Sequence, residues 1–311
     1  MKKSYYVIAA IGLVIFIGAI CLLYEKGVTK KSENLDSKNM DASTKCDESS
    51  EENSENDEDK RFVTLPLEAN LEDESTYYKL SNEKLAWWIK RGEDHAQSCA
   101  DNTVKLSLYD ACFLDEKVTD DDKIIYMTFD CGYDNGYTEK MLDVLAKEDV
   151  PACFFVTQTY IRDNIDIVKR MKSEGHQVGN HSISHPDMTN ISFDEIVHEL
   201  EGCSTYMETA TGYRMDPYFR PPKGEYSERL LAIAQDMGYK TIFWSMAYMD
   251  YDVNKQPGKD YVIEHFEKYH HNGAIVLMHN VSSSNAEALE TVIKMLKEEG
   301  YRFESLNNME F

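Results

Sequence analysis

From residue 123 onward, apolar and polar residues follow two alternating patterns. Short, nearly continuous apolar runs, typical of buried strands, are each followed by a segment with apolar residues at helical spacing that stops at a glycine. Ser192 and Glu195 form a capping-box pattern, and the helix that they open is predicted to end near Gly212. Strands are predicted at 124–130, 152–157, 177–181, 218–221, 241–245, 275–279 and 303–306.

Repeated strand-then-helix units predict an α/β fold in which helices cover parallel strands, either as a barrel or as an open sheet. In both architectures the chemistry lies at the carboxyl ends of the strands. No glycine-rich phosphate loop follows these strands, which argues against a nucleotide enzyme. Residues able to do chemistry stand at several predicted strand ends, namely Asp130, His181, Arg220, Ser245 and His279.

Segments of different composition precede these units. Residues 5–24 form an uncharged apolar run long enough to span a bilayer, so residues 1–31 are predicted to be a membrane anchor, with a cleaved secretion signal as the alternative. Lysines before the span favour a cytoplasmic N-terminus and an extracytoplasmic remainder. Residues 32–60 carry eleven acidic and three basic residues and no aromatic residue, which predicts a disordered acidic linker.

Residues 61–118 show mixed polarity and no repeat. We predict a mostly helical N-terminal extension, packed on a domain that spans residues 119–311. The adjacent Trp87 and Trp88 are expected in the apolar core rather than as a platform for sugars.

Composition narrows the range of partners. The net charge of −23 argues against binding nucleic acid, whose phosphates would be repelled. The seven cysteines are odd in number and form no C-x-x-C pair, which indicates neither a disulfide framework nor a zinc knuckle. Cys99 and Cys112 are the one pair considered for a bridge.

The spacing of His181 and His185 allows both imidazoles to bind one metal ion if the segment makes a helical turn. A polar loop with two unrelated histidines is the alternative. Asp130 ends an apolar strand, where a charge is costly unless it is paired or functional. Paired with Arg220 it would stay ionised and suit a general base, whereas the alternative is a capping role in the following turn.

His279 closes another apolar strand. It is either a buried core histidine or, with a carboxylate such as Asp250 beside it, a general acid. Cleavage of an amide needs such an acid, because an unprotonated amine leaves poorly.

These segments together resemble the polysaccharide deacetylase family, the NodB-homology group of carbohydrate esterases. The resemblance covers roughly residues 119–311 and rests on TFDCGY (128–133), HSISH (181–185), RPPKG (220–224), Asp250 and the LMH that ends at His279. It implies a distorted (β/α) barrel. Within the family, the sequence is similar to the delta-lactam-biosynthetic de-N-acetylases, which act on N-acetylmuramic acid in spore-cortex peptidoglycan. This similarity rests on the segments GYDNGYT (132–138), HSISHPDMT (181–189), FWSMA (243–247) and VSSSNAEAL (281–289).

The resemblance also implies roles for individual residues. Asp130 would be the base, oriented by Arg220, and His279 the acid, tuned by Asp250. His181 and His185 would hold the metal ion. The backbone N–H of Lys223 would face the oxyanion, and from charge alone we hypothesise that its ammonium meets the lactyl carboxylate of muramic acid. Tyr133 and Tyr251 are expected to contact substrate.

Position 131 departs from the family, which has Asp there, or often Asn in the subgroup. A Cys131 thiolate could complete a Cys-His-His site and would favour zinc; alternatively the side chain points away and the metal is held by two histidines and waters. Tyr251 stands where many members have Trp, and it keeps an aromatic wall.

The expected function is removal of N-acetyl groups from peptidoglycan sugars by a membrane-anchored, extracytoplasmic enzyme that uses a divalent metal, zinc by preference. The expected substrate is N-acetylmuramic acid in a glycan strand, after an amidase has removed the peptide. A deacetylase of N-acetylglucosamine is the alternative within this class. A wall-binding protein that has lost catalysis is the alternative from another class.

Overall fold

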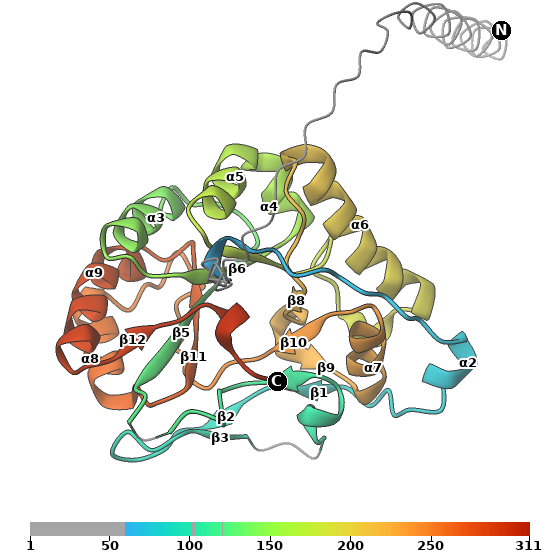
Figure 1. Cartoon of the computed structure of the whole chain (residues 1–311), viewed down its shortest axis with the longest axis horizontal. Helices are drawn as coiled ribbons and strands as arrows, with labels where there is room; N and C mark the ends of the chain where they lie inside the picture. The colour runs from blue at the N-terminus through green and yellow to red at the C-terminus, as the bar shows by residue number, and fades with distance from the viewer. Residues whose placement is uncertain (1–59, 101–103, 120) are drawn as a thin grey trace, which may run out of the picture. The chain divides into compact units, whose positions relative to one another are not determined.

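The computed structural model describes residues 60–100, 104–119 and 121–311 (Figure 1). The predicted membrane span at 5–24 lies outside the described residues, as does the acidic linker except for Lys60. Within the described ranges, no helix is both long and apolar enough to cross a membrane.

In this part of the chain, eight strands form one curled parallel sheet. Its order is β11-β5-β6-β7-β8-β10-β4, and β12 pairs with β5. Each strand predicted from the apolar runs is present. The bounds are β4 (Ala111–Cys112), β5 (Ile124–Cys131), β6 (Ala152–Val156), β7 (Gln177–Asn180), β8 (Tyr218–Phe219), β10 (Lys240–Ile242), β11 (Ala274–His279) and β12 (Arg302–Phe303).

The two edges of the sheet approach each other. Leu114, just after β4, forms an isolated bridge with Ala274, and Met246, beyond β10, forms one with Val276. Both partners belong to β11, so the sheet curls into a partly closed barrel. The predicted distorted (β/α) barrel is confirmed.

Helices cover the outside of this sheet (Figure 1). The predicted capping box is present, since Ser192 accepts from Glu195 N–H while the Glu195 carboxylate accepts from Ser192 N–H, and the helix ends at Gly212 in the left-handed region. The helices are α3 (Thr138–Lys147), α4 (Gln158–Asp163), α5 (Ile165–Ser173), α6 (Phe193–Thr211), α7 (Glu228–Asp236), α8 (Lys259–Tyr269) and α9 (Ser283–Glu298).

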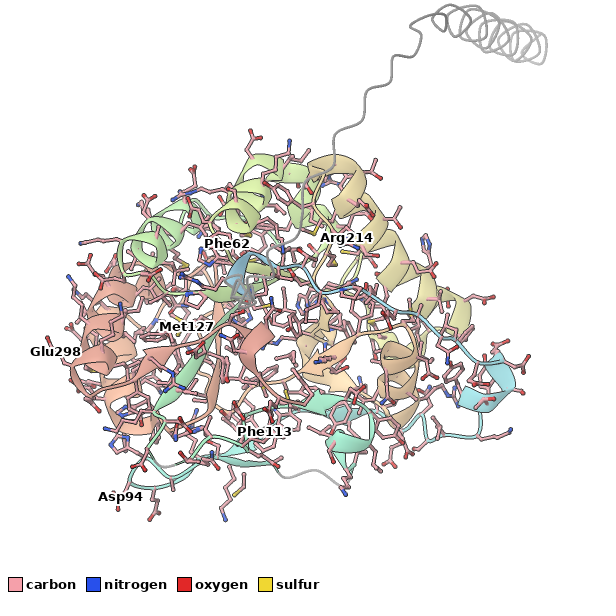
Figure 2. All side chains as sticks on the ribbon, viewed as in Figure 1. Phe62, Asp94, Phe113, Met127, Arg214 and Glu298 are labelled. Carbon is pink, nitrogen blue, oxygen red and sulfur yellow. The ribbon has the colours of Figure 1, made fainter. Side chains whose placement is uncertain are left out.

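Side chains fill the space between sheet and helices (Figure 2), where Met127 is buried while Asp94 and Glu298 lie at the periphery. Successive residues of a strand point to opposite faces. On β5, Met127 and Cys131 join the apolar layer beneath the helices, whereas Tyr126 packs in a separate cluster. Asp130, between Phe129 and Cys131, lines the pocket described below.

The prediction that residues 61–118 are mostly helical is wrong. Within its described residues this extension has one short α-helix, α2 (Glu74–Tyr77), two 3₁₀ turns and four two-residue strands. The strands pair with the barrel or with each other: β1 (Leu85–Ala86) with β9 (Glu225–Tyr226), β4 with β10, and β2 (Ile89–Lys90) with β3 (Cys99–Ala100). Pairing with a strand edge satisfies backbone polar groups that a helix would satisfy internally.

The tryptophan pair divides between two environments. Trp87 is buried, its ring stacks on Phe243 at a centroid distance of 4.5 Å, and its Nε1–H donates to the Trp244 carbonyl. Trp88 is 57% exposed. The core prediction is confirmed for Trp87 and wrong for Trp88, because neighbouring residues in extended chain point in opposite directions. Both Cys99 and Cys112 are free thiols, so the bridge considered between them is absent.

A buried ion pair holds β7, the strand that leads into His181. The Asp216 carboxylate accepts from Lys172 Nζ at 2.6 Å and from Val178 N–H at 2.7 Å, and the Asp216 N–H donates to the Val178 carbonyl. The side chains of Lys172 and Asp216 are 6% and 0% exposed. Loss of either partner would leave the other buried without a counter-charge.

We therefore expect Lys172→Met to lower the free energy of unfolding by about 3 to 5 kcal/mol, the usual cost of leaving a buried charge unpaired. Denaturation in urea measures the change. Lys169→Met, on the exposed side of the same helix, is the control and should leave the transition nearly unchanged. Equal midpoints for the two variants would contradict a stabilising role for the pair.

Candidate active site

A pocket of about 840 Å³ opens at the carboxyl ends of the strands. It gathers most of the residues singled out from the sequence. Arg220 and Asp250 are fully buried and lie behind its wall. The predicted residues that line it are Asp130, Tyr133, His181, His185, Lys223, Tyr251 and His279.

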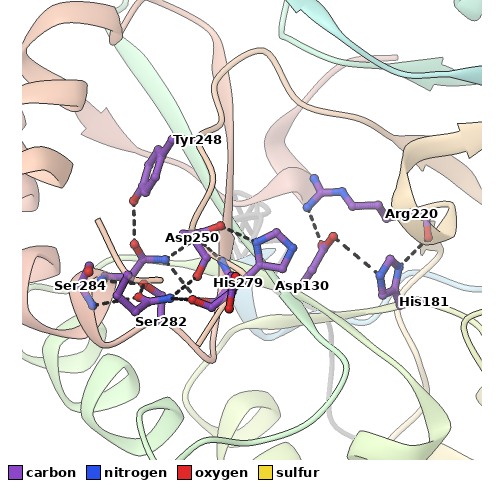
Figure 3. Close-up of polar contacts among 11 residues, drawn as sticks. Asp130, His181, Arg220, Tyr248, Asp250, His279, Ser282 and Ser284 are labelled. Carbon is purple, nitrogen blue, oxygen red and sulfur yellow. Dashed lines mark hydrogen bonds and ion pairs between the residues drawn. The ribbon is translucent and has the colours of Figure 1, made fainter. Parts of the chain in front are cut away.

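The carboxylate of Asp130 is fixed by Arg220 (Figure 3). Arg220 Nη1 lies 2.8 Å from Asp130 Oδ1, while Nε and Nη2 donate to the carbonyls of Ile242 and Phe243. The guanidinium also stands over the Phe155 ring at 4.2 Å. Burial by itself raises the pKa of Asp130, but the positive charge of Arg220 and smaller contributions from neighbouring histidines bring that pKa below its usual value. Asp130 is therefore ionised and aimed into the pocket.

His181 and His185 lie side by side in the loop after β7, with ring centroids 4.8 Å apart. His181 Nδ1 lies 2.8 Å from the Arg220 carbonyl. A carbonyl can only accept, so Nδ1 carries the proton and Nε2 keeps its lone pair. Nε2 lies 3.7 Å from Asp130 Oδ2. Burial lowers the pKa of both histidines, that of His185 to about 4, so both imidazoles are neutral.

The backbone around this pair is not the helical turn assumed from the spacing. Ser182 and His185 adopt left-handed φ values of 70° and 58°. The His185 N–H donates to Ser182 Oγ, and Ser184 is held by the Glu199 carboxylate on α6. Side-chain hydrogen bonds of this kind stabilise a turn that is otherwise strained.

The donor groups on this side of the pocket fit a divalent cation. Two neutral imidazoles with free lone pairs are metal ligands, and the bond from His181 Nδ1 to a carbonyl fixes the tautomer that metal binding requires. Within the described residues, no group of three or more His, Cys, Asp or Glu side chains has the geometry of a complete protein-ligand set. A metal here would therefore take its remaining ligands from water or substrate.

Cys131 is not placed to bind that metal. Its side chain is fully buried in the apolar layer under the helices, it does not line the pocket, and its Sγ lies 3.9 Å from the Phe129 carbonyl. Burial raises the pKa of this thiol well above its usual range. Of the two alternatives left open for Cys131, the structure agrees with the one in which the side chain points away, because β5 extends through residue 131 and puts Cys131 on the face opposite Asp130. The preference for zinc, which rested on a thiolate, loses its basis.

His279 lies on the other side of Asp130 from His181 (Figure 3). Its Nδ1 lies 2.7 Å from Asp250 Oδ1, and its backbone N–H donates to Asp250 Oδ2. Burial by itself lowers the pKa of His279, but the charge and hydrogen bond of Asp250, with a smaller contribution from Asp130, raise it above its usual value. The Asp250–His279 pair predicted from the sequence is therefore formed, with its Nε2 side toward the pocket.

A further amide holds this pair. Asn285 Nδ2 donates to Asp250 Oδ2 at 2.6 Å, and Asn285 Oδ1 accepts from the Tyr248 hydroxyl at 2.8 Å. Neither residue was identified from the sequence, where Asn285 is simply the polar start of a helix. Asn285 lies in the first turn of α9 and is fully buried. Its burial is a tertiary feature, so the sequence carried no local signal for this role.

Aromatic side chains form the open rim. Tyr133, Tyr251 and Trp88 are each more than half exposed, and Tyr251 lies 5.7 Å from the His279 ring. The contact positions predicted for both tyrosines agree with this placement. Trp88 was missed, because its expected place was the core. Lys223 is exposed on the same pocket wall with a left-handed φ of 59°.

Comparison with known proteins identifies the family of the chain. The family model described as polysaccharide deacetylase matches residues 117–242. The peptidoglycan-N-acetylmuramic acid deacetylase PdaA of Bacillus subtilis (strain 168) is 43% identical over 232 residues, which are 74% of this chain and 87% of that protein.

Solved structures agree as well. A structure of Bacillus subtilis PdaA, described as a family 4 carbohydrate esterase, has a TM-score of 0.70 at 42% identity and covers 74% of this chain and 98% of that chain. A CE4 family pseudoenzyme from Bacillus anthracis has a TM-score of 0.58 at 32% identity and covers 64% of this chain and 68% of that chain. The fold, the site and these likenesses together show that the chain belongs to the polysaccharide deacetylase family of hydrolases that act on N-acetyl amide bonds.

Proposed function

We propose that this protein removes the N-acetyl group from N-acetylmuramic acid in peptidoglycan, in a reaction that depends on a divalent metal. One observation carries the proposal. An ionised carboxylate, two neutral imidazoles and a histidine with a raised pKa converge on a single pocket, whose wall also carries the exposed ammonium of Lys223. The likeness to PdaA, whose name gives muramic acid as its substrate, supports the choice of sugar.

The residues of this chain divide the reaction between the two sides of the pocket. Asp130 accepts the proton of the attacking water as the water oxygen bonds to the acetyl carbon. The oxyanion that forms faces the backbone N–H of Lys223. His279 then donates its proton to the sugar nitrogen while the C–N bond breaks, which yields acetate and a free amine. A divalent cation held by His181 and His185 would act as a Lewis acid that polarises the carbonyl.

Three finer parts of the proposal concern the setting. The free amine can close a δ-lactam with the lactyl carboxyl group of the same sugar only when that carboxyl carries no peptide, so an amidase would act first. The product would then be the muramic δ-lactam of spore cortex. Residues 5–24 would anchor the enzyme in the membrane with its catalytic domain outside the cytoplasm.

The direct test is release of acetate from peptide-free peptidoglycan glycan strands. Wild-type protein should release acetate, a chelator should abolish the release, and added divalent metal should restore it. Asp130→Asn should lower the rate by about 10²- to 10⁴-fold, the range for loss of a general base. No release with any added metal would contradict the hydrolase and favour the inactive wall-binding protein. Release that a chelator does not affect would contradict the role of the metal.

The raised pKa of His279 predicts the pH dependence of this reaction. His279 must be protonated to act as an acid, so activity should fall as the pH rises through its pKa. Asp250→Asn removes the charge that raises that pKa, and the alkaline limb of the kcat profile should then move to lower pH. Asp252→Asn, an exposed carboxylate two residues away, is the control. An unmoved limb in Asp250→Asn would contradict His279 as the acid.

The position of Cys131 predicts that its thiol is dispensable for metal binding. Cys131→Ala should retain the metal content and the acetate release of the wild type. Its free energy of unfolding should fall by about 1 kcal/mol, because a small buried side chain has been truncated. His185→Ala is the matched contrast and should lose metal. Metal analysis of the purified proteins measures the difference. Loss of metal from Cys131→Ala would contradict this prediction and indicate that the Cys131 thiolate is a ligand.

A further inference from the structure

Trp88, supplied by the N-terminal extension, and Lys223 both line the wall of the pocket. The antiparallel register of β1 and β9 pairs Leu85 with Tyr226 and Ala86 with Glu225. The contact between the two segments continues one residue beyond these pairs, up to the 3₁₀ turn Pro222–Gly224, in which Lys223 has a left-handed φ of 59°.

Contacts at the intervening position support that continuation. The Trp87 N–H donates to the Gly224 carbonyl at 2.8 Å, and a Cβ built on Gly224 would lie 3.3 Å from Trp87 Cβ. Trp87 and Gly224 are thus in direct contact, although the Gly224 N–H bonds to the Pro221 carbonyl within its own turn. Gly224 has a φ of 66° and no room for a Cβ, since Trp244 Cη2 would lie 2.7 Å away. This packing holds the segment that carries Lys223 against the extension.

The Trp88 indole and the Lys223 ammonium make no polar or stacking contact with the described part of the chain. Among residues 60–100, 104–119 and 121–311, no ring stacks on Trp88, no acceptor meets its indole N–H, and no carboxylate pairs with Lys223. The adjacent Trp87 shows the contrast, because its ring is stacked and its N–H is bonded. The Trp88 indole is 57% exposed in the pocket wall, so its ring face and its N–H are both available to a ligand.

We propose that Trp88 and Lys223 form a subsite for a carboxylated amino sugar of a glycan strand. The indole covers the apolar C–H face of the sugar ring, and the ammonium pairs with the carboxylate. Both residues line the same pocket as His185, and the proposal places there the sugar whose N-acetyl group lies at the histidine pair. In a 3-O-lactyl sugar the carboxylate hangs from the carbon next to the one that bears the N-acetyl group, which matches this arrangement. The inference rests on the proposed function for the identity of the glycan.

Tryptophan fluorescence tests the subsite without catalysis. The chain has three tryptophans, and all three line the pocket. Trp87 and Trp244 are only 4% and 6% exposed, so Trp88 should respond most to solvent exclusion, and its replacement isolates its share of the signal. Peptide-free glycan strands titrated into the slow Asp130→Asn variant, which leaves most of them intact during the titration, should shift the emission to shorter wavelength. Asp130→Asn/Trp88→Phe should lose that shift and, because Phe keeps an aromatic face, should bind nearly as tightly by calorimetry.

Kinetics on otherwise wild-type protein give the energetic test. Trp88→Ala should raise KM for peptide-free glycan strands about tenfold with kcat little changed, a factor that corresponds to loss of one good contact. Lys223→Met should raise KM for those strands and leave KM for an N-acetylglucosamine oligomer of equal length unchanged. In the double variant, the increase in KM for these strands should be smaller than the product of the two single increases, because both residues hold one sugar.

Tyr78→Ala is the matched control. Tyr78 is half exposed, belongs to the same extension and lies outside the pocket, so its loss should leave KM unchanged. An unchanged KM in Trp88→Ala, together with an emission spectrum that glycan does not alter, would overturn the subsite while leaving the deacetylase intact. A normal fluorescence response without any acetate release from the wild type would instead contradict the proposed function and leave the subsite standing.

Discussion

The buried guanidinium of Arg220 is the group on which the rest of the site depends. Its side chain binds Asp130 at the end of β5 and the carbonyls of Ile242 and Phe243 at the end of β10, and its backbone carbonyl binds His181 beyond β7. One residue directly after β8 thus joins four strand ends of the barrel, its own included. A guanidinium stays protonated in proteins, so Arg220 is always charged. Its charge and that of Asp130 compensate each other, and either one buried alone would be strongly destabilising.

The two sides of the pocket receive opposite electrostatic environments. The Arg220 charge holds the pKa of Asp130 below its usual value, while the charge of Asp250 raises the pKa of His279. One group is thereby kept as a base and the other as an acid at the same pH, which is the condition for acid and base catalysis in a single site. Asn285 contributes to this difference indirectly, because its amide fixes the Asp250 carboxylate beneath His279.

The N-terminal extension is an integral part of the barrel, although its mixed composition gave no sign of this. It supplies β4 to the sheet, buries Trp87 against Phe243, and places Trp88 at the rim. These contacts are made by short extended pieces, each too short to be stable without a partner strand. The extension is therefore part of the catalytic domain in structural terms and contributes directly to the wall of the pocket.

Much of the site followed from the sequence because strand ends carry a local signal. An apolar run that stops at Asp130 or His279 shows where a strand ends, and parallel strands bring their carboxyl ends to one edge. Local pattern also determined the α6 capping box. Tertiary structure decided the rest. Whether Cys131 faced metal or core depended on how far β5 continued, and Trp88 reached the pocket through a pairing with residues more than a hundred positions away. Such pairings depend on which edges the folded barrel leaves open, and no local run of residues encodes that.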